Sequence, residues 1–250
     1  MNFDTLDTEE KAQQLRMDRL KKINNGEVWG PLSEGPYLVW HWLPISEKTL
    51  FSPDDLKSMD FSKFVENRKI GSIEVIPNPC SVRIYSDQKD ETREDKNSND
   101  EKLNIRRFWN VQVFYSGALE MTCALSFSEN ESDQKRVSLG CIFMKSNETM
   151  NGFKECMSSF NITVPIIMGI SLLRAQDYRF SVIHPRTGDP DPGFLSSKKQ
   201  ITLERKIENL QGMRIEEIER PILDALWRIL GYDRCDYYTE DGSRITPEKY

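Results

Sequence analysis

Apolar and polar residues alternate most regularly in the stretch FWNVQVFYSGALEMTCALSF, residues 108–127. Apolar side chains occupy every second position on either side of a Ser-Gly pair, at Trp109, Val111, Val113, Tyr115, Leu119, Met121, Cys123, Leu125 and Phe127. A period of two is typical of a strand with one buried face. The pattern therefore predicts two antiparallel strands joined by a two-residue hairpin turn at Ser116-Gly117.

The stretch GPYLVWHWLPIS, residues 35–46, is apolar on both faces instead of one. Tyr37, Val39 and Leu43 fall on one side of an extended chain, and Leu38, Trp40 and Trp42 fall on the other. Such a run predicts a central strand of about eight residues that is covered on both sides.

Helical spacing appears near both ends of the chain and in its middle. Residues 7–25 predict an N-terminal helix, with Asp7 as N-cap and Glu10 completing a capping box. Its buried face is formed by Ala12, Leu15, the stem of Arg19, Leu20 and Ile23. Apolar residues at helical intervals predict a middle helix over 150–160, and residues 214–230 predict a C-terminal helix that Pro221 kinks or divides. A short capped helix is expected within 52–65.

Further apolar runs predict strands at 72–77, 81–86, 137–144, 163–173, 178–183 and 200–210. Strands that follow one another, with helices at the ends and between them, indicate an α+β fold around a mostly antiparallel sheet. We expect residues 1–250 to form a single domain of this class. Residues 86–102 have no apolar side chain, so we expect a mobile loop there, with a functional lid as the alternative.

The composition is that of a folded protein with no electrostatic signature of nucleic-acid binding. Apolar residues make up 38%, charged residues 30%, and the net charge is −6 with both signs interspersed. Direct nucleic-acid binding by this chain is therefore disfavoured. We find no apolar run of membrane-spanning length and no secretion signal, so we expect a cytoplasmic protein that does not contact membranes. The five cysteines are scattered without a Cys-x-x-Cys pair, so we expect neither a metal nor a disulfide framework.

The strongest candidate for a pocket or an interface is the trio Trp40, His41 and Trp42. A catalytic base needs a partner and a path to substrate, whereas the sequence neighbours of His41 are bulky and apolar. We therefore favour a core histidine hydrogen-bonded to backbone or to a buried carboxylate. A metal site at His184, Asp189 and Asp191 is disfavoured because the spacing fits no known metal loop. Nucleotide-binding and nucleophile-elbow motifs are missing, so we expect no catalytic site and no cofactor.

Four segments, in order, resemble a known family: RMDRLKKINNGEVWGPLSEGPYLVWHWLPIS, FWNVQVFYSGALEM, NITVPIIMGISLLRAQDYRF and ERPILDALWRILGYDRCDYYTEDG. The resemblance is to the C-terminal region of bacterial DNA-binding or ATP-binding proteins that carry an N-terminal Schlafen-type, AlbA-like domain. The matching positions are Gly35, Pro36, Leu38, Val39, His41 and Pro44; Gln112, Phe114, Gly117 and Glu120; and Pro221, Leu223 to Trp227, Gly231, Glu240, Asp241 and Gly242. Together the segments span roughly residues 16–245.

In that family the AlbA-like domain precedes the first helix and carries the nucleic-acid or nucleotide chemistry. Too few residues precede Asp7 for such a domain, so we expect the C-terminal module alone, as part of a longer protein or as a separate subunit. The resemblance implies a non-catalytic regulatory or interaction module in transcription control or phage defence. Its expected partner is an AlbA-like domain, in cis or in trans, or a second copy. The alternative is a small-molecule-binding or hydrolytic domain with a pocket near Trp40, His41 and Trp42.

Overall fold

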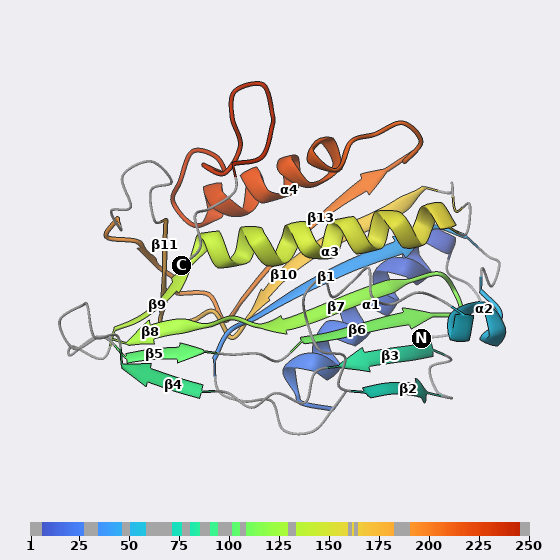
Figure 1. Ribbon diagram of the computed structural model, residues 1–250, viewed down its shortest axis with the longest axis horizontal. Helices are drawn as coiled ribbons and strands as arrows, with labels where there is room; N and C mark the ends of the chain where they lie inside the picture. The colour runs from blue at the N-terminus through green and yellow to red at the C-terminus, as the bar shows by residue number, and fades with distance from the viewer. Residues whose placement is uncertain are drawn as a thin grey trace.

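The computed structural model describes residues 7–27, 35–46, 51–58, 72–76, 81–85, 91–94, 102–105, 109–129, 134–159, 162, 165–182 and 191–245. Within these residues the chain forms four helices and two mostly antiparallel sheets, which confirms the predicted α+β class (Figure 1). In the part of the chain that is described, no helix has the length and apolar character needed to cross a bilayer.

The larger sheet has seven strands, and every neighbouring pair runs antiparallel. In spatial order they are β13 (Gln200–Ile207), β10 (Ile166–Leu173), β1 (Tyr37–Pro44), β7 (Leu119–Ala124), β6 (Trp109–Phe114), β3 (Ser81–Tyr85) and β2 (Ser72–Ile76). The smaller sheet contains β12 (Phe194–Leu195), β11 (Tyr178–Ser181), β9 (Lys135–Ser138), β8 (Phe127–Glu129), β5 (Lys102–Ile105) and β4 (Glu91–Glu94). Only the β9–β11 pair in it is parallel.

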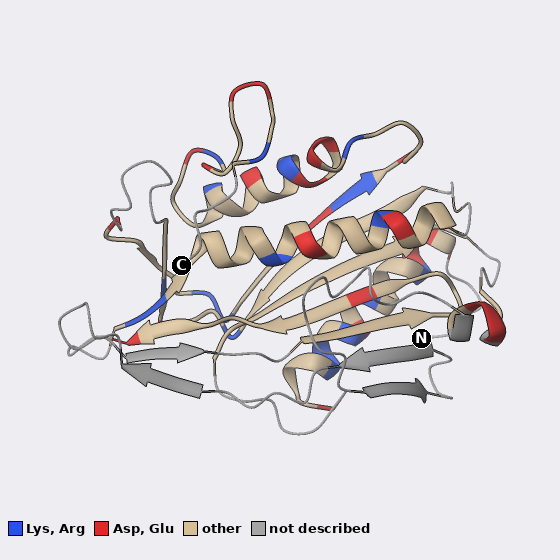
Figure 2. Cartoon of the chain, viewed as in Figure 1, with Lys and Arg blue, Asp and Glu red and all other residues tan. Residues whose placement is uncertain are grey.

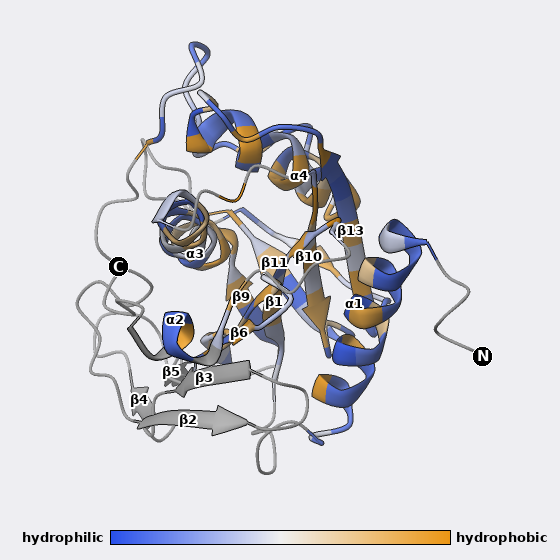
Figure 3. Cartoon of the chain, turned by 90° about the vertical axis from the view of Figure 1, so that its right-hand side faces the viewer, coloured by the Kyte–Doolittle hydropathy of each residue, from blue (hydrophilic) through white to orange (hydrophobic). Residues whose placement is uncertain are grey.

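Helices cover both faces of the larger sheet. The N-terminal helix α1 (Thr8–Asn24) packs on β1 and β10, while α3 (Leu139–Ser159) and α4 (Ile215–Ile229) lie on the opposite face (Figure 3). The short helix α2 (Pro53–Ser58) lies beside β3. Charged residues gather on the helices and on β13, whereas β1 and β10 are almost entirely uncharged (Figure 2). The main hydrophobic core lies between the sheet and α3 and α4, and two smaller apolar clusters lie under α1.

Strand β1 confirms the interpretation of the GPYLVWHWLPIS run. It lies between β10 and β7, and all eight of its residues are buried. The hairpin of β6 and β7 is also confirmed, with one correction to its turn. Phe114 pairs with Ala118, so the loop has three residues instead of two, and Gly117 takes the left-handed conformation (φ +82°) that completes this turn.

The predicted strand over 137–144 is wrong beyond Ser138. Helix α3 begins at Leu139 and runs for 21 residues, through the middle helix that we expected at 150–160. Leu139, Ile142, Phe143 and Ser146 are buried at helical spacing and continue the stripe of the later turns. A short apolar run fits either period, and only packing against the sheet decides between them.

Residues 86–102 contain regular structure that the sequence did not predict. Glu91–Glu94 forms β4, which pairs with β5 from Lys102 onward. An antiparallel pair satisfies its backbone hydrogen bonds without needing an apolar side chain, which explains why hydropathy missed it. The rest of the predicted mobile loop lies outside the described residues, and its mobility stays a prediction.

Helix α4 continues through Pro221. Proline has no N–H, so the carbonyl of Glu217, four residues earlier, loses its helical donor. The side chain of Arg205 on β13 replaces that donor, with Nη1 lying 3.2 Å from the Glu217 carbonyl and 3.4 Å from that of Ile218. The helix is therefore stabilised at its weakest turn by the neighbouring edge strand.

Candidate functional site

Strand β1 separates the three residues of the predicted pocket. Trp40 and Trp42 point toward α3, where Trp40 Nε1 donates to Ser146 Oγ (3.0 Å) and Trp42 packs edge-on against Phe153 (5.5 Å). His41 points toward α1 on the other face, since neighbouring residues of a strand alternate. The structure therefore does not bring Trp40, His41 and Trp42 into one pocket.

His41 lies instead in a row of directly opposed residues that crosses the sheet and is polar at every position except Gly169. Directly opposed residues on five neighbouring strands are Glu204, Gly169, His41, Glu120 and Gln112. The row follows from register alone, because residues opposite one another on antiparallel strands point to the same face. That face is the one covered by α1.

Arg19 of α1 binds the centre of this row. Its Nε and Nη2 donate to the two carboxylate oxygens of Glu120 at 2.8 and 2.7 Å, and Nη2 also donates to Gln112 Oε1 at 2.7 Å. His41 Nε2 lies 3.1 Å from Glu120 Oε2. We call Arg19, His41, Gln112 and Glu120 the polar cluster. The contact between Arg19 and Glu120 is bidentate, which is the strongest geometry available to a guanidinium and a carboxylate.

Arg16 makes a second anchor one turn earlier on α1. Its Nη1 donates to Glu204 (2.9 Å), and its Nη2 donates to Ser171 Oγ (3.1 Å) and to the Leu203 carbonyl (2.8 Å). The guanidinium reaches these partners by lying directly over Gly169, where an added Cβ would overlap Arg16 Nε and sit 2.6 Å from Cζ. Gly169 is therefore the position that lets Arg16 approach the sheet.

The charges of the polar cluster are balanced inside the protein. Burial opposes the charged form of Glu120, but the charge and hydrogen bonds of Arg19, with a further contribution from His41, lower the pKa of Glu120 to about 2. Burial lowers the pKa of His41, and this outweighs the opposite effect of Glu120. A neutral imidazole with its proton on Nε2 donates to the Glu120 carboxylate. The cluster at neutral pH thus consists of one Arg–Glu ion pair with two neutral hydrogen-bond partners.

This arrangement is suited to holding α1 on the sheet. The four residues are at most 4% exposed, so within the described part of the chain a substrate has no route to His41 or Glu120. A general base must reach the proton that it removes, and Glu120 with so low a pKa is a poor one. The interpretation of His41 as a core histidine bonded to a buried carboxylate agrees with this geometry.

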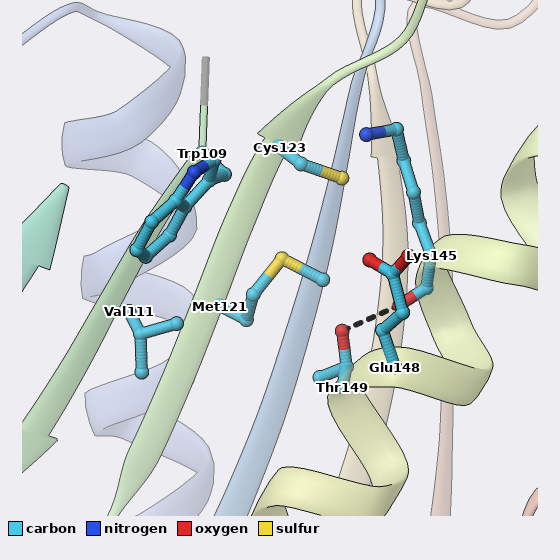
Figure 4. Close-up of a pocket in the computed structure, with 7 residues that line it drawn as sticks. All are labelled: Trp109, Val111, Met121, Cys123, Lys145, Glu148 and Thr149. Atoms are coloured by element: carbon cyan, nitrogen blue, oxygen red, sulfur yellow. Dashed lines mark hydrogen bonds between the residues drawn. The ribbon is translucent and has the colours of Figure 1, made fainter. Parts of the chain in front are cut away.

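A small hollow lies on the opposite face, between the β6–β7 hairpin and α3 (Figure 4). Its sheet side is lined by Trp109, Val111, Met121 and Cys123, and its helix side by Lys145, Glu148 and Thr149. Its volume of about 10 Å³ is close to the least that one buried water requires. The hollow has room for a water and not for an organic ligand.

The described residues contain no group of three or more His, Cys, Asp or Glu side chains that could hold a metal ion. Of the disfavoured metal trio, His184 and Asp189 lie outside the described residues. Asp191 accepts backbone hydrogen bonds from Val182 (3.2 Å) and Gly193 (3.0 Å), which gives it a role in the local turn.

Sequence reasoning missed the polar cluster as a unit, although signals for it were present. His41, Gln112 and Glu120 are matching positions of the family resemblance, and the structure brings all three together. Arg19 was expected on the buried face of α1, but only through its stem. Arg16 and Gly169 carried no signal, because a buried arginine over a glycine is recognisable only once the register of β10 is known.

Comparison with known proteins identifies no relative of this chain. No protein-family model matches the chain, and no curated protein or solved structure matches it at a significant level.

Proposed function

We propose that this chain is a non-catalytic interaction module that partners an AlbA-like nucleic-acid-binding effector in transcription control or phage defence. The resemblance of the motifs at His41, Gln112 and Glu120 is the source of this proposal. In the proteins that carry these motifs, the effector domain precedes the helix that corresponds to α1. The function of α1 would then be to hold the effector in a defined position on the module.

The anchoring of α1 is the observation that carries the proposal. A helix of 17 residues is only marginally stable on its own. A loosely docked helix could not hold an effector domain in a fixed orientation. Here Arg16 and Arg19 bind partners on four strands, from the half-exposed Glu204 on β13 to the buried Gln112 on β6. Truncating one member of a buried charge pair leaves the other unpaired, at a cost of about 3–5 kcal/mol. These contacts fix the orientation of α1 relative to the larger sheet.

The alternative, a small-molecule-binding or hydrolytic domain centred on Trp40, His41 and Trp42, has less support. All three side chains are buried and point to different faces of the sheet. The hollow beside Trp109 accommodates about one water. We therefore retain the interaction module as the proposed function.

The proposal is tested by mixing the chain with an AlbA-like protein from the same genome and measuring the mass of the complex by light scattering after gel filtration. We expect a stable complex. Met17 on α1 is 52% exposed, so Met17→Asp should weaken the complex without unfolding the chain. Met144 on α3 is 37% exposed on the opposite side of the sheet, and Met144→Asp is the matched control that should leave binding unchanged.

DNA binding gives an independent test. With a net charge of −6, the chain alone should bind duplex DNA no better than the non-specific range of about 10⁻⁴ to 10⁻⁶ M, with strong salt dependence. The complex should bind at least tenfold more tightly. Sub-micromolar, salt-resistant binding by the chain alone, or no complex with the AlbA-like protein, would contradict the proposed function.

A further inference from the structure

Glu219 is a buried acid on the apolar face of α4. Its side chain is fully buried, and one carboxylate oxygen, Oε2, accepts from the Tyr238 hydroxyl (3.0 Å) and from Arg244 Nη2 (2.7 Å). The other oxygen, Oε1, is buried and finds no hydrogen-bond partner among the described residues. An unpaired buried oxygen is costly on a carboxylate and much less costly on a protonated acid, in which Oε1 is the hydroxyl.

The two donors belong to a hairpin near the end of the chain. Tyr238 and Arg244 face each other across an antiparallel bridge, and the Ile245 N–H donates to the Tyr237 carbonyl (2.8 Å). We call residues 237–245 the C-terminal hairpin. Glu219 therefore binds both strands of this hairpin through one oxygen. Tyr237 stacks on Phe143 of α3 (5.0 Å between ring centres), so the hairpin also covers the main core.

Several charged or titratable groups face this site from the elements around it. On α4 they are Glu216, Arg220 and Asp224; before and within the hairpin they are Cys235, Asp236, Tyr238 and Arg244; and on β13 Arg205 binds the backbone of the same turn of α4. Burial opposes the charged form of Glu219 more strongly than Arg244 and Tyr238 favour it, and Glu216 adds to the opposition. These effects raise the pKa of Glu219 from 4.5 to about 7.

We propose that Glu219 is a proton-operated latch, which holds the C-terminal hairpin on α4 when it is protonated and loosens it when the proton is lost. Opening the hairpin lets the carboxylate reach water, where its pKa returns toward 4.5. The closed form therefore binds a proton more tightly than the open form, and opening becomes easier as the pH rises between about 4.5 and about 7. When Glu219 is charged in the closed form, the positive charge of Arg244 offsets part of the cost of burying the carboxylate.

Opening would uncover aromatic side chains of the core. Trp227 of α4 lies edge-on to Tyr237 at 6.4 Å, and Phe143 contacts both Tyr237 and Tyr238. The latch thus couples the protonation of one buried acid to the exposure of an apolar surface between α3 and α4. This inference does not depend on the proposed function.

The test is amide hydrogen exchange followed by NMR on the intact chain from pH 5 to pH 8, expressed as protection factors so that the intrinsic pH dependence is removed. The Ile245 amide reports closure of the hairpin. A difference of 2.5 pKa units (7 − 4.5) allows its protection to fall by at most about 300-fold, mostly below pH 7. The carboxyl carbon of Glu219 should titrate near pH 7 in the same samples.

Glu219→Gln keeps the shape of the side chain without its charge, so it should keep the hairpin protected and remove the pH dependence. Glu217→Gln, on an exposed neighbour in the same helix, is the matched control and should behave like the wild type. Arg244→Gln removes the offsetting cation and should move the midpoint to higher pH, which a merely structural contact would not do. Protection that is flat with pH in the wild type, or a pH dependence that survives in Glu219→Gln, would overturn the proposal.

Discussion

Replacing Gly169 by alanine tests whether the anchor of Arg16 is as close as the geometry indicates. An alanine Cβ at this position would overlap Arg16 Nε and lie 2.6 Å from Cζ and 2.8 Å from Nη2. The guanidinium would have to leave the surface of β10, and with it the hydrogen bonds to Ser171 and to the Leu203 carbonyl. Overpacking a core typically costs about 1–3 kcal/mol. One lost hydrogen bond to a charged group adds about 1.5–3 kcal/mol.

We therefore expect Gly169→Ala to lower the free energy of unfolding by about 2.5–6 kcal/mol. For a chain of 250 residues, each kcal/mol corresponds to about 2–4 °C in Tm. Urea denaturation followed by circular dichroism measures the loss directly. The m-value should stay unchanged, because the surface exposed on unfolding is the same.

The same substitution in an Arg16→Ala background distinguishes this mechanism from a general intolerance of β10. With the guanidinium removed, the new methyl group has space. Glycine inside a strand is about 0.5–1 kcal/mol less favourable than alanine, so the second substitution should be neutral or slightly stabilising. The coupling energy should be about 2.5–6 kcal/mol, well above the 0.3–0.5 kcal/mol typical of independent sites. An equal cost of Gly169→Ala in both backgrounds would refute the reasoning.

Three further expectations concern groups in and around the core. His41→Asn should lower the unfolding free energy by about 1–3 kcal/mol, because it leaves part of Glu120 unsatisfied, and thermal unfolding should detect the change. Glu120→Gln should cost about 3–5 kcal/mol, since it leaves Arg19 buried without its counter-charge. The pKa of Glu120 is lowered to about 2, so its stabilisation is complete above pH 4.5 and is lost as the pH falls through about 2. The free energy of unfolding should therefore fall less between pH 4.5 and pH 2 in Glu120→Gln than in the wild type. Burial raises the pKa of Cys156 to about 12, so at pH 8 iodoacetamide should alkylate Cys156 only after unfolding, and the half-buried Cys141 sooner, as mass spectrometry can show.

The local sequence pattern was sufficient to predict a helix or strand wherever that element has a recognisable pattern of its own. The alternation around Ser116-Gly117 predicted the β6–β7 hairpin, and the capping box of Asp7 and Glu10 predicted where α1 begins. The doubly apolar GPYLVWHWLPIS run predicted a strand covered on both faces, which is how β1 lies. These signals depend on residues within a few positions of one another, and their physical causes act over the same range.

Pattern was insufficient where two local structures compete. The apolar run after Ser138 fits a strand or a helix, and its burial against the sheet selected the helix α3. The charged segment at Glu91–Glu94 lacked an apolar signal because its strand is defined by backbone pairing with β5. Pro221 predicted a kink or a division in the C-terminal helix, whereas α4 continues through it and Arg205 from a separate strand supplies the missing donor.

The candidate site shows the same division between sequence and tertiary structure. Apolar neighbours were enough to predict that His41 is a core histidine with a buried partner. That partner, Glu120, lies 79 positions away in the sequence, and only the pairing of β1 with β7 brings it to His41. Arg19 reaches the same carboxylate across 101 positions. The sequence by itself determined the β6–β7 hairpin, the start of α1 and the double burial of β1, because hydropathy and capping act locally. Only the tertiary structure decided which buried charges meet, because strand register and helix docking set those distances.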